Sequence, residues 1–222
     1  MGISERRERE KTERRKAIMN CTKELIREHG VERVNMENIA AMAELSKATV
    51  YLYFSSKEDL LNEICEEAGR KFHEYLKSFN EAGLNGMAAL KYIWRGYIEL
   101  FGSSNEMIIV FQVRNYLNSW LPIVSMEGKH QSPYIDKILM TVKELIEGCK
   151  AEGVFAPDLD TDVATRLLLS LFSIIVEHAS KLPAGVRAAP AVIDEMTNTF
   201  QIIVRGFARE GIEHSLLDIR TI

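Results

Sequence analysis

The sequence predicts an all-α protein. Apolar residues recur at the three- and four-residue spacing of helices through almost all of the 222 residues. No segment of useful length alternates apolar and polar residues as a half-buried strand would, and no repeat is apparent. The composition, with 46% hydrophobic and 27% charged residues, is that of a globular chain long enough to bury a sizeable core.

Four helices are expected in the first 80 residues, each with a recognisable start or stop. Gly30 is placed to end the first helix, and Asn35 and Ser46 are placed to cap the second and third. Ser55 and Glu58 have the spacing of a capping box, which would start the fourth. The expected helices run up to Gly30, over 36–43, over 46–54 and from Ser55 to about residue 80.

The rest of the chain is expected to form five more helices, delimited by glycine and proline. Gly86 precedes an aromatic-rich helix, Pro122 stops the next one, and Pro133 is a good first residue for the third. Residues 153–160 read as a connector. The expected ranges are 86–101, from the 102–105 turn to Leu121, 133–153, 161–182 and 190–210.

The amino terminus differs in charge from the body of the chain. Residues 1–16 contain seven basic and four acidic residues, whereas the remainder contains 21 basic and 28 acidic residues. Such a split suggests an arm for a polyanion, and it is also common in a solvated helix start with its own ion pairs. Charge alone leaves both interpretations open.

Several classes of protein find no support in the sequence. The three cysteines, Cys21, Cys65 and Cys149, are too far apart for a zinc knuckle or a disulfide framework, which fits a reduced, cytoplasmic setting. The longest apolar run, 167–176, is half the length that a membrane helix needs, and the charged start is no signal peptide. No histidine spacing indicates a metal, and no nucleophile, phosphate-loop or dinucleotide motif indicates an enzyme or a cofactor.

The most informative stretch is 36–54, where two short helices joined by about three residues form a helix-turn-helix. The second helix keeps Val50 and Phe54 for the core. It also has hydrogen-bond donors and aromatic rings suited to phosphates, base edges and thymine methyl groups, namely Lys47, Thr49, Tyr51 and Tyr53. An ordinary corner between two helices in an all-α protein would show the same spacing, so the spacing alone does not establish DNA binding.

Residues 15–61 resemble the amino-terminal domain of the TetR family of bacterial transcriptional regulators. The matching residues are His29-Gly30, Ile39-Ala40, Ser46-Lys47-Ala48-Thr49-Val50-Tyr51, Tyr53-Phe54 and Ser56-Lys57-Glu58-Asp59-Leu60-Leu61. The chain departs from the pattern at Glu44-Leu45, where the family usually has Gly-Val, and at Ala48, where Gly is frequent. If position 44 has a positive φ angle, glutamate costs about 1 kcal/mol there.

The resemblance implies a domain organisation and a set of DNA contacts. Residues 1–13 would be a basic arm, 14–72 the DNA-binding domain and 73–222 a regulatory and dimerisation domain. The second helix of the pair would lie in the major groove, with Lys57 and Asn35 on phosphates and the arginines of residues 6–15 along phosphates or in the minor groove. The implied DNA-binding residues are Asn35, Ser46, Lys47, Ala48, Thr49, Tyr51, Tyr53 and Lys57.

The resemblance also implies a homodimer and a small-molecule pocket. Helices 161–182 and 190–210 would pair with their copies in a four-helix bundle, through candidates that could equally face the monomer core: Leu167, Leu171, Ile174, Ile175, Phe200, Ile203 and Phe207. An effector pocket would lie within residues 84–178, although an aromatic stripe is also common in plain cores. Its candidate lining is Tyr92, Trp94, Tyr97, Phe101, Phe111, Gln112, Tyr116, Trp120 and Phe172.

The resulting hypothesis is a sequence-specific DNA-binding transcriptional regulator. It would act as a repressor that a small, largely apolar ligand releases from a palindromic operator. The alternatives are an activator of the same fold and a helical ligand-binding protein that no longer reads DNA. No cofactor, metal or membrane partner is expected.

Overall fold

The computed structural model describes residues 3–81, 83–84, 86–103, 106–117, 133–180, 182, 186 and 190–220. Within these residues the regular elements are helices, together with one isolated bridge between Phe155 and Ala208. The predicted all-α class is therefore confirmed. The chain divides into two compact units: unit 1 comprises Met1–Glu67 and Gln112–Ser119, and unit 2 comprises Ala68–Phe111 and Trp120–Ile222.

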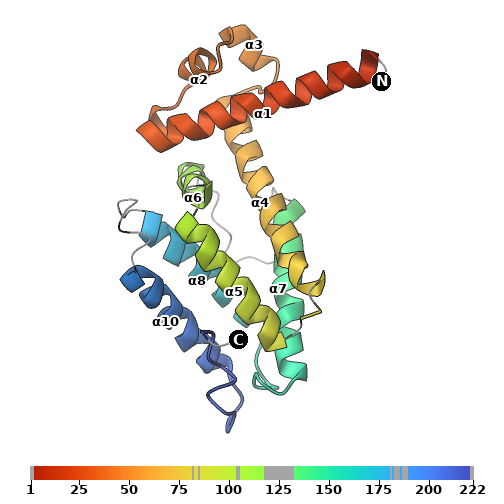
Figure 1. Ribbon diagram of the computed structural model, residues 1–222, viewed down its shortest axis with the longest axis vertical. Coiled ribbons are helices and arrows are strands. Elements are labelled where there is room, and N and C mark those ends of the chain that lie inside the picture. Colours follow the sequence, from red (N-terminus) through yellow and green to blue (C-terminus); the bar gives the residue numbers. More distant parts are fainter. Residues whose placement is uncertain are drawn as a thin grey trace. The chain divides into compact units, whose positions relative to one another are not determined.

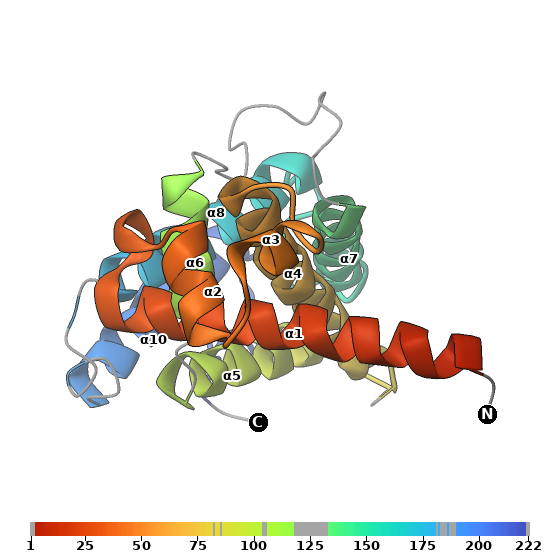
Figure 2. The same ribbon diagram turned by 90° about the horizontal axis from the view of Figure 1, so that it is seen from above.

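Unit 1 is built on one long helix and two short ones (Figures 1 and 2). Its elements are α1 (Ile3–His29), η1 (Val31–Arg33), α2 (Met36–Met42), α3 (Lys47–Tyr51), the first part of α4 (Lys57–Glu81) and the end of α6 (Glu106–Tyr116). Its core is formed by apolar side chains of α1, α2, α3 and α4, which recur at helical spacing along each helix. The fully buried members include Ile18, Ile39, Val50, Phe54, Leu61 and Ile64.

The helix starts of unit 1 follow local rules, with one correction. Asn35 caps α2 as predicted, in a reciprocal pair with Asn38: each backbone N–H donates to the other side chain at 2.9 Å. The box predicted for Ser55 and Glu58 is wrong by one residue. Ser56 Oγ accepts from the Asp59 N–H at 3.0 Å, and the Asp59 carboxylate accepts from the backbone N–H of Ser55 at 2.8 Å.

The amino-terminal residues predicted as an arm are helical from Ile3 onward and continue into α1. Exposed ion pairs one turn apart join Arg6 to Glu10 and Arg9 to Glu13. These contacts match the second sequence interpretation, a solvated helix start with internal pairs. They leave the positive residues of this segment on the surface.

Unit 2 holds the remaining helices (Figure 1). They are the rest of α4, α5 (Gly86–Ser103), the first part of α6, α7 (Pro133–Ala151), α8 (Thr161–Ser180) and α10 (Pro190–Phe207). Helix α7 packs against both α5 and α8, and α8 packs against α10. The indole of Trp94 lies parallel to the Phe200 ring, with centroids 4.1 Å apart, at the centre of this core.

The segment after α10 folds back onto unit 2. Hydrogen bonds of 2.9 Å beside the Phe155–Ala208 bridge link Ala156 N–H to the Phe207 carbonyl and Arg209 N–H to the Val154 carbonyl. Further along, the Gln201 side chain donates to the Leu217 carbonyl at 2.7 Å and accepts from the Ile219 N–H at 3.0 Å. The carboxyl-terminal segment is thus a fixed wall of the unit, with Ile219 buried.

Several predicted boundaries differ from the observed ones. Helix α3 ends at Tyr51 and not at residue 54, because the Tyr53 N–H turns back only three residues, to the Val50 carbonyl at 3.0 Å. The helix expected to reach Leu121 ends at Tyr116, and residues 118–132 lie outside the described ones. The last two helices end at Ser180 and Phe207. Among the described residues, no helix combines the length and apolar character that a membrane crossing requires.

Candidate nucleic-acid interface

The α2–α3 pair turns without glycine. Glu44 lies between the helices with a φ of 55°, and the Leu45 N–H donates to the Ala40 carbonyl at 2.9 Å, closing the turn. From the sequence, a strain is expected at position 44 if its φ angle is positive, and the φ angle is positive. A residue with a Cβ costs about 1 kcal/mol in this conformation, so the turn is held against an intrinsic preference.

Helix α3 is capped at its start and buried along one side. Ser46 Oγ accepts from the Thr49 N–H at 3.0 Å and lies 2.8 Å from the Thr49 hydroxyl. Val50 is fully buried against unit 1, which fixes the rotation of the helix about its axis. With one face anchored, the opposite face is presented to solvent in a defined orientation.

The exposed face of α3 differs somewhat from the predicted one. Ser46, Lys47 and Ala48 are exposed, and Tyr51 is 45% exposed, so its ring is available. The side chains of Thr49 and Tyr53 are partly buried, so they are less accessible than predicted. Tyr53 lies in the turn after α3.

Leu52 was not among the predicted site residues. It follows Tyr51 on the open side and is 82% exposed, more than any other large apolar side chain reported for the described residues. Its position opposite Val50 on a helical wheel was the available signal in the sequence. An apolar side chain of this kind is suited to thymine methyl groups.

Lys47 is held by an acidic neighbour. Its ammonium forms an ion pair with the Glu37 carboxylate of α2 and lies 5.9 Å from the Tyr51 ring centroid. The pair, chiefly through its hydrogen bond, raises the pKa of Lys47 and lowers the pKa of Glu37. Lys47 is therefore fully charged, but part of its field is cancelled by Glu37.

Lys57 lies at the start of α4 with two partners inside unit 1. Its ammonium donates to the Val31 carbonyl at 2.7 Å and stands 4.2 Å from the centroid of the Tyr116 ring. An ammonium has three N–H donors, so donation to Val31 leaves others for a phosphate. The first-turn N–H groups of α4 add to the positive potential there.

Arg15 has a different place from the one predicted for the arginines of residues 6–15. Its guanidinium binds both oxygens of Glu63 at 3.0 and 2.8 Å and donates to the Tyr53 carbonyl at 2.6 Å. It also stands 4.2 Å from the Phe54 ring centroid. Arg15 therefore braces the turn after α3, since three of its five N–H donors are used within unit 1.

The predicted ligand-binding residues do not form a single described cluster. Trp94 lies in the core of unit 2, and Tyr92 is partly exposed and stacked on Tyr75 with centroids 6.2 Å apart. Gln112 and Tyr116 belong to unit 1. Trp120 and the side chains of Tyr97, Phe101, Phe111 and Phe172 lie outside what the structure describes.

The dimerisation candidates also separate. Phe200 and Phe207 are buried in the core of unit 2, and Leu171, Ile175 and Ile203 pack against it. Leu167 and Ile174 of α8 are exposed, as are two residues that were not predicted, Val163 and Ile202. Among the described residues, no group of three or more His, Cys, Asp or Glu side chains is placed to hold a metal ion.

The chain is similar to known bacterial regulators. Residues 18–64, from the buried part of α1 into α4, match the family described as bacterial regulatory proteins, tetR family. The fatty acid metabolism regulator protein of Bacillus subtilis is 23% identical over 68% of this chain and 73% of that protein. A probable acrEF/envCD operon repressor of Escherichia coli is 23% identical over 78% of this chain and 80% of that protein.

A solved structure has the same fold along nearly the whole chain. It is a TetR-family transcriptional regulator from Pectobacterium atrosepticum, with a TM-score of 0.67 and 19% identity over 90% of this chain and 97% of that one. The matched segment holds the capped α2–α3 pair and the braced turn after it. Residues 18–64 therefore match the tetR family of bacterial regulatory proteins, and the chain as a whole has the fold of a solved regulator of that family.

Proposed function

We propose that the protein is a DNA-binding transcriptional repressor whose recognition element is α3. The observation that carries this proposal is the orientation of α3: Val50 is buried, while Tyr51 and Leu52 are open to solvent. A capped helix of this kind, fixed by its neighbours, can present base-reading side chains in the major groove. The probable operon repressor of E. coli and the fatty acid metabolism regulator of B. subtilis are relatives with this type of role in their names.

Phosphate contacts would orient α3 in the groove. Lys57 retains free N–H donors at the start of α4, and Lys47 lies at the start of α3. Asn35 is exposed at the start of α2, where its side-chain oxygen is already used by the Asn38 N–H. The exposed basic residues of early α1, Arg7, Lys11 and Arg14, supply a positive surface for the flanking backbone.

A dimer would pair two recognition helices on a palindromic operator. Val163, Leu167 and Ile174 lie on one side of α8 at helical spacing and are exposed, as is Ile202 on the neighbouring α10. Exposed aliphatic side chains on two adjacent helices are suited to a self-complementary interface. We therefore place the dimer interface on these faces of α8 and α10, with Phe200 and Phe207 inside each monomer.

Release from DNA would follow the binding of a small, largely apolar molecule to unit 2. Such a ligand acts only if it binds the state with poor DNA affinity more tightly than the DNA-binding state. Moving the equilibrium from 99:1 to 1:99 requires a difference of about 5.5 kcal/mol.

Selection of binding sites from random DNA duplexes tests this function. The full-length protein is incubated with the library at physiological salt over several rounds, with Tyr51→Ala and Leu52→Ala in parallel. Enrichment of a palindrome by the wild type, with weaker enrichment by both variants, is the expected result. A folded dimer that enriches no sequence would favour the alternative, a ligand-binding protein that no longer reads DNA.

A further inference from the structure

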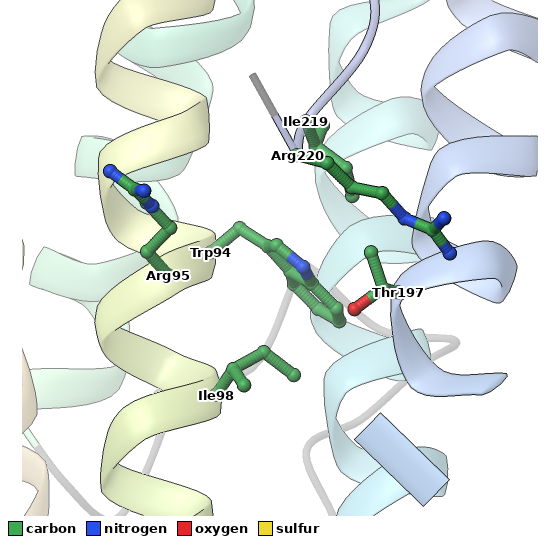
Figure 3. Close-up of a pocket in the computed structure, with 6 residues that line it drawn as sticks. All are labelled: Trp94, Arg95, Ile98, Thr197, Ile219 and Arg220. Atoms are coloured by element: carbon green, nitrogen blue, oxygen red, sulfur yellow. The ribbon is translucent and has the colours of Figure 1, made fainter. Parts of the chain in front are cut away.

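Unit 2 contains a cavity of about 430 Å³ between α5, α10 and the carboxyl-terminal segment. Its lining residues are Trp94, Arg95, Ile98, Thr197, Ile219 and Arg220 (Figure 3). This volume lies within the range that holds small organic ligands in proteins. All six residues belong to unit 2.

The floor of the cavity is apolar and rigid. Trp94 is buried, and its indole is stacked on Phe200 in parallel at 4.1 Å, so it cannot turn without breaking the core. Ile98 comes from the next turn of α5, and Ile219 lines the cavity from the carboxyl-terminal segment, with the Trp94 indole between the two in the view (Figure 3). Two hydrogen bonds fix that wall: the Gln201 side chain donates to the Leu217 carbonyl and accepts from the Ile219 N–H.

The two arginines on the rim are not equivalent. Arg220 donates to the Asn198 side chain at 2.7 Å and lies 3.7 Å from the Asp194 carboxylate, so its charge is compensated. Arg95 is exposed, and the described part of the chain gives it no hydrogen bond or ion pair. Figure 3 shows Arg95 rising from α5 on the side of Trp94 away from Arg220.

An exposed arginine that has no partner among the described residues, at the edge of an apolar floor, selects a particular ligand chemistry. A guanidinium binds a carboxylate through two parallel hydrogen bonds, whereas the indole and the two isoleucines favour a hydrocarbon body. A more highly charged ligand would need further cations than Arg95, since Arg220 is engaged by Asp194. The chemistry therefore favours a monoanion with an apolar tail.

We propose that this cavity binds an amphipathic carboxylate, with the tail against Trp94, Ile98 and Ile219 and the carboxylate on Arg95. The proposal names the ligand class for a site that includes one of the predicted effector residues, Trp94. It rests on the part of the proposed function in which unit 2 binds a small molecule, and it does not depend on DNA binding.

Fluorescence of Trp94 tests the proposal directly. The chain has two tryptophans, so Trp120→Phe leaves Trp94 as the reporter in full-length protein. Decanoate is titrated below its micelle concentration, with decanol as the matched uncharged probe. Calorimetry of decanoate binding to the unaltered chain provides a readout that does not depend on tryptophan.

The matched variants are Arg95→Gln and Arg205→Gln, which remove one exposed arginine each, from α5 and from the last turn of α10. The expected result is saturable decanoate binding that Arg95→Gln weakens about tenfold or more, with Arg205→Gln unchanged. Decanol is expected to bind more weakly than decanoate and to be indifferent to Arg95→Gln.

Three outcomes would overturn the proposal: no saturable binding, equal affinity for decanol and decanoate, or decanoate binding that Arg95→Gln does not change. The last outcome would place the ligand elsewhere in the protein. Because no DNA is present, failure here leaves the duplex selection and the DNA-binding function untouched.

Discussion

The guanidinium of Arg15 and the main chain of Tyr53 are joined by a 2.6 Å hydrogen bond, across 38 residues of sequence. The same guanidinium binds both carboxylate oxygens of Glu63 on α4, which raises the pKa of Arg15. Arg15 thus connects α1, the turn after α3 and the start of α4. The position of the recognition helix depends on this residue although it is outside the helix-turn-helix.

Replacement of Arg15 is expected to lower stability. Arg15→Gln removes the hydrogen bond to Tyr53 and the contact with Phe54, and the free energy of unfolding should fall by about 1–2 kcal/mol. The half-exposed ion pair with Glu63 contributes little to this figure because water screens it. Urea denaturation measures the change, and exposed Arg14→Gln, the adjacent arginine, should change stability by less than about 0.5 kcal/mol. Equal losses in both variants would contradict the bracing role.

Removal of the Glu37 charge is expected to strengthen DNA binding. Glu37→Gln frees Lys47 from its ion pair and removes a negative charge beside the surface proposed to face DNA. If Lys47 then meets one phosphate, the slope of log affinity against log salt should steepen by about 0.9. Titration of a fluorescent duplex at several salt concentrations gives the slope. Glu195→Gln, the same change on α10, should leave it unaltered, and a wild-type slope in Glu37→Gln would show that Lys47 gains no phosphate.

Lys57→Met tests a phosphate contact at the start of α4. Methionine keeps an apolar stem beside the Tyr116 ring but removes the charge that lies 4.2 Å from its centroid. Binding of the operator and of random duplexes should weaken by a similar factor, with the salt slope reduced by about 0.9. Tyr116→Phe keeps the ring and should have no such effect. A loss confined to the operator would instead assign Lys57 to base recognition.

The left-handed turn at residue 44 offers a stabilising substitution. Glu44→Gly should raise the free energy of unfolding by up to about 1 kcal/mol, because glycine adopts the observed φ of 55° without a Cβ clash. Chemical denaturation measures the gain. Glu44→Ala keeps the Cβ and should give no gain in stability. An equal gain in the alanine and glycine variants would show that the effect comes from the loss of the carboxylate.

His73 should make stability depend on pH. Burial, followed by the positive charges of Lys77 and Lys137, lowers the pKa of His73 in the folded state. The unfolded chain then binds more protons near its ordinary pKa of about 6.5, so stability is complete above that pH and falls as the solution becomes more acidic. Urea midpoints at several pH values should show this decline in wild type and a smaller one in His73→Gln. An unchanged decline in the variant would assign the acid sensitivity to other groups.

Local chemistry explains which features of unit 1 were predictable from the sequence. Asn35 and Ser46 cap helices through groups three residues away, so their roles are legible in a short window. The early end of α3 was missed because it depends on the Tyr53 N–H bonding to the Val50 carbonyl three residues back, which no residue type in this window signals. The wrong box at Ser55 reflects two adjacent serines with two adjacent acids, where either register satisfies the pattern.

Contacts between distant residues were not predictable in the same way. Arg15 and Glu63 are 48 residues apart, and nothing in either neighbourhood marks the pairing. Tyr116 is a pocket residue implied by the family resemblance, and nothing in its own neighbourhood marks the contact of its ring with Lys57. Phe200 and Phe207 fit a dimer stripe as well as a core stripe, and only the fold of unit 2 decides between them.

The shortness of α3 has a consequence for the order in which unit 1 assembles. Five residues are too few to form a stable helix by themselves, since the first turn costs more than its hydrogen bonds return. Helix α3 can therefore form only when Val50 and Phe54 dock against partners that already exist, including the 27-residue α1. The surface proposed to read DNA therefore depends on packing that the other helices of unit 1 supply, and its amide protons should exchange with solvent before those around Ile18.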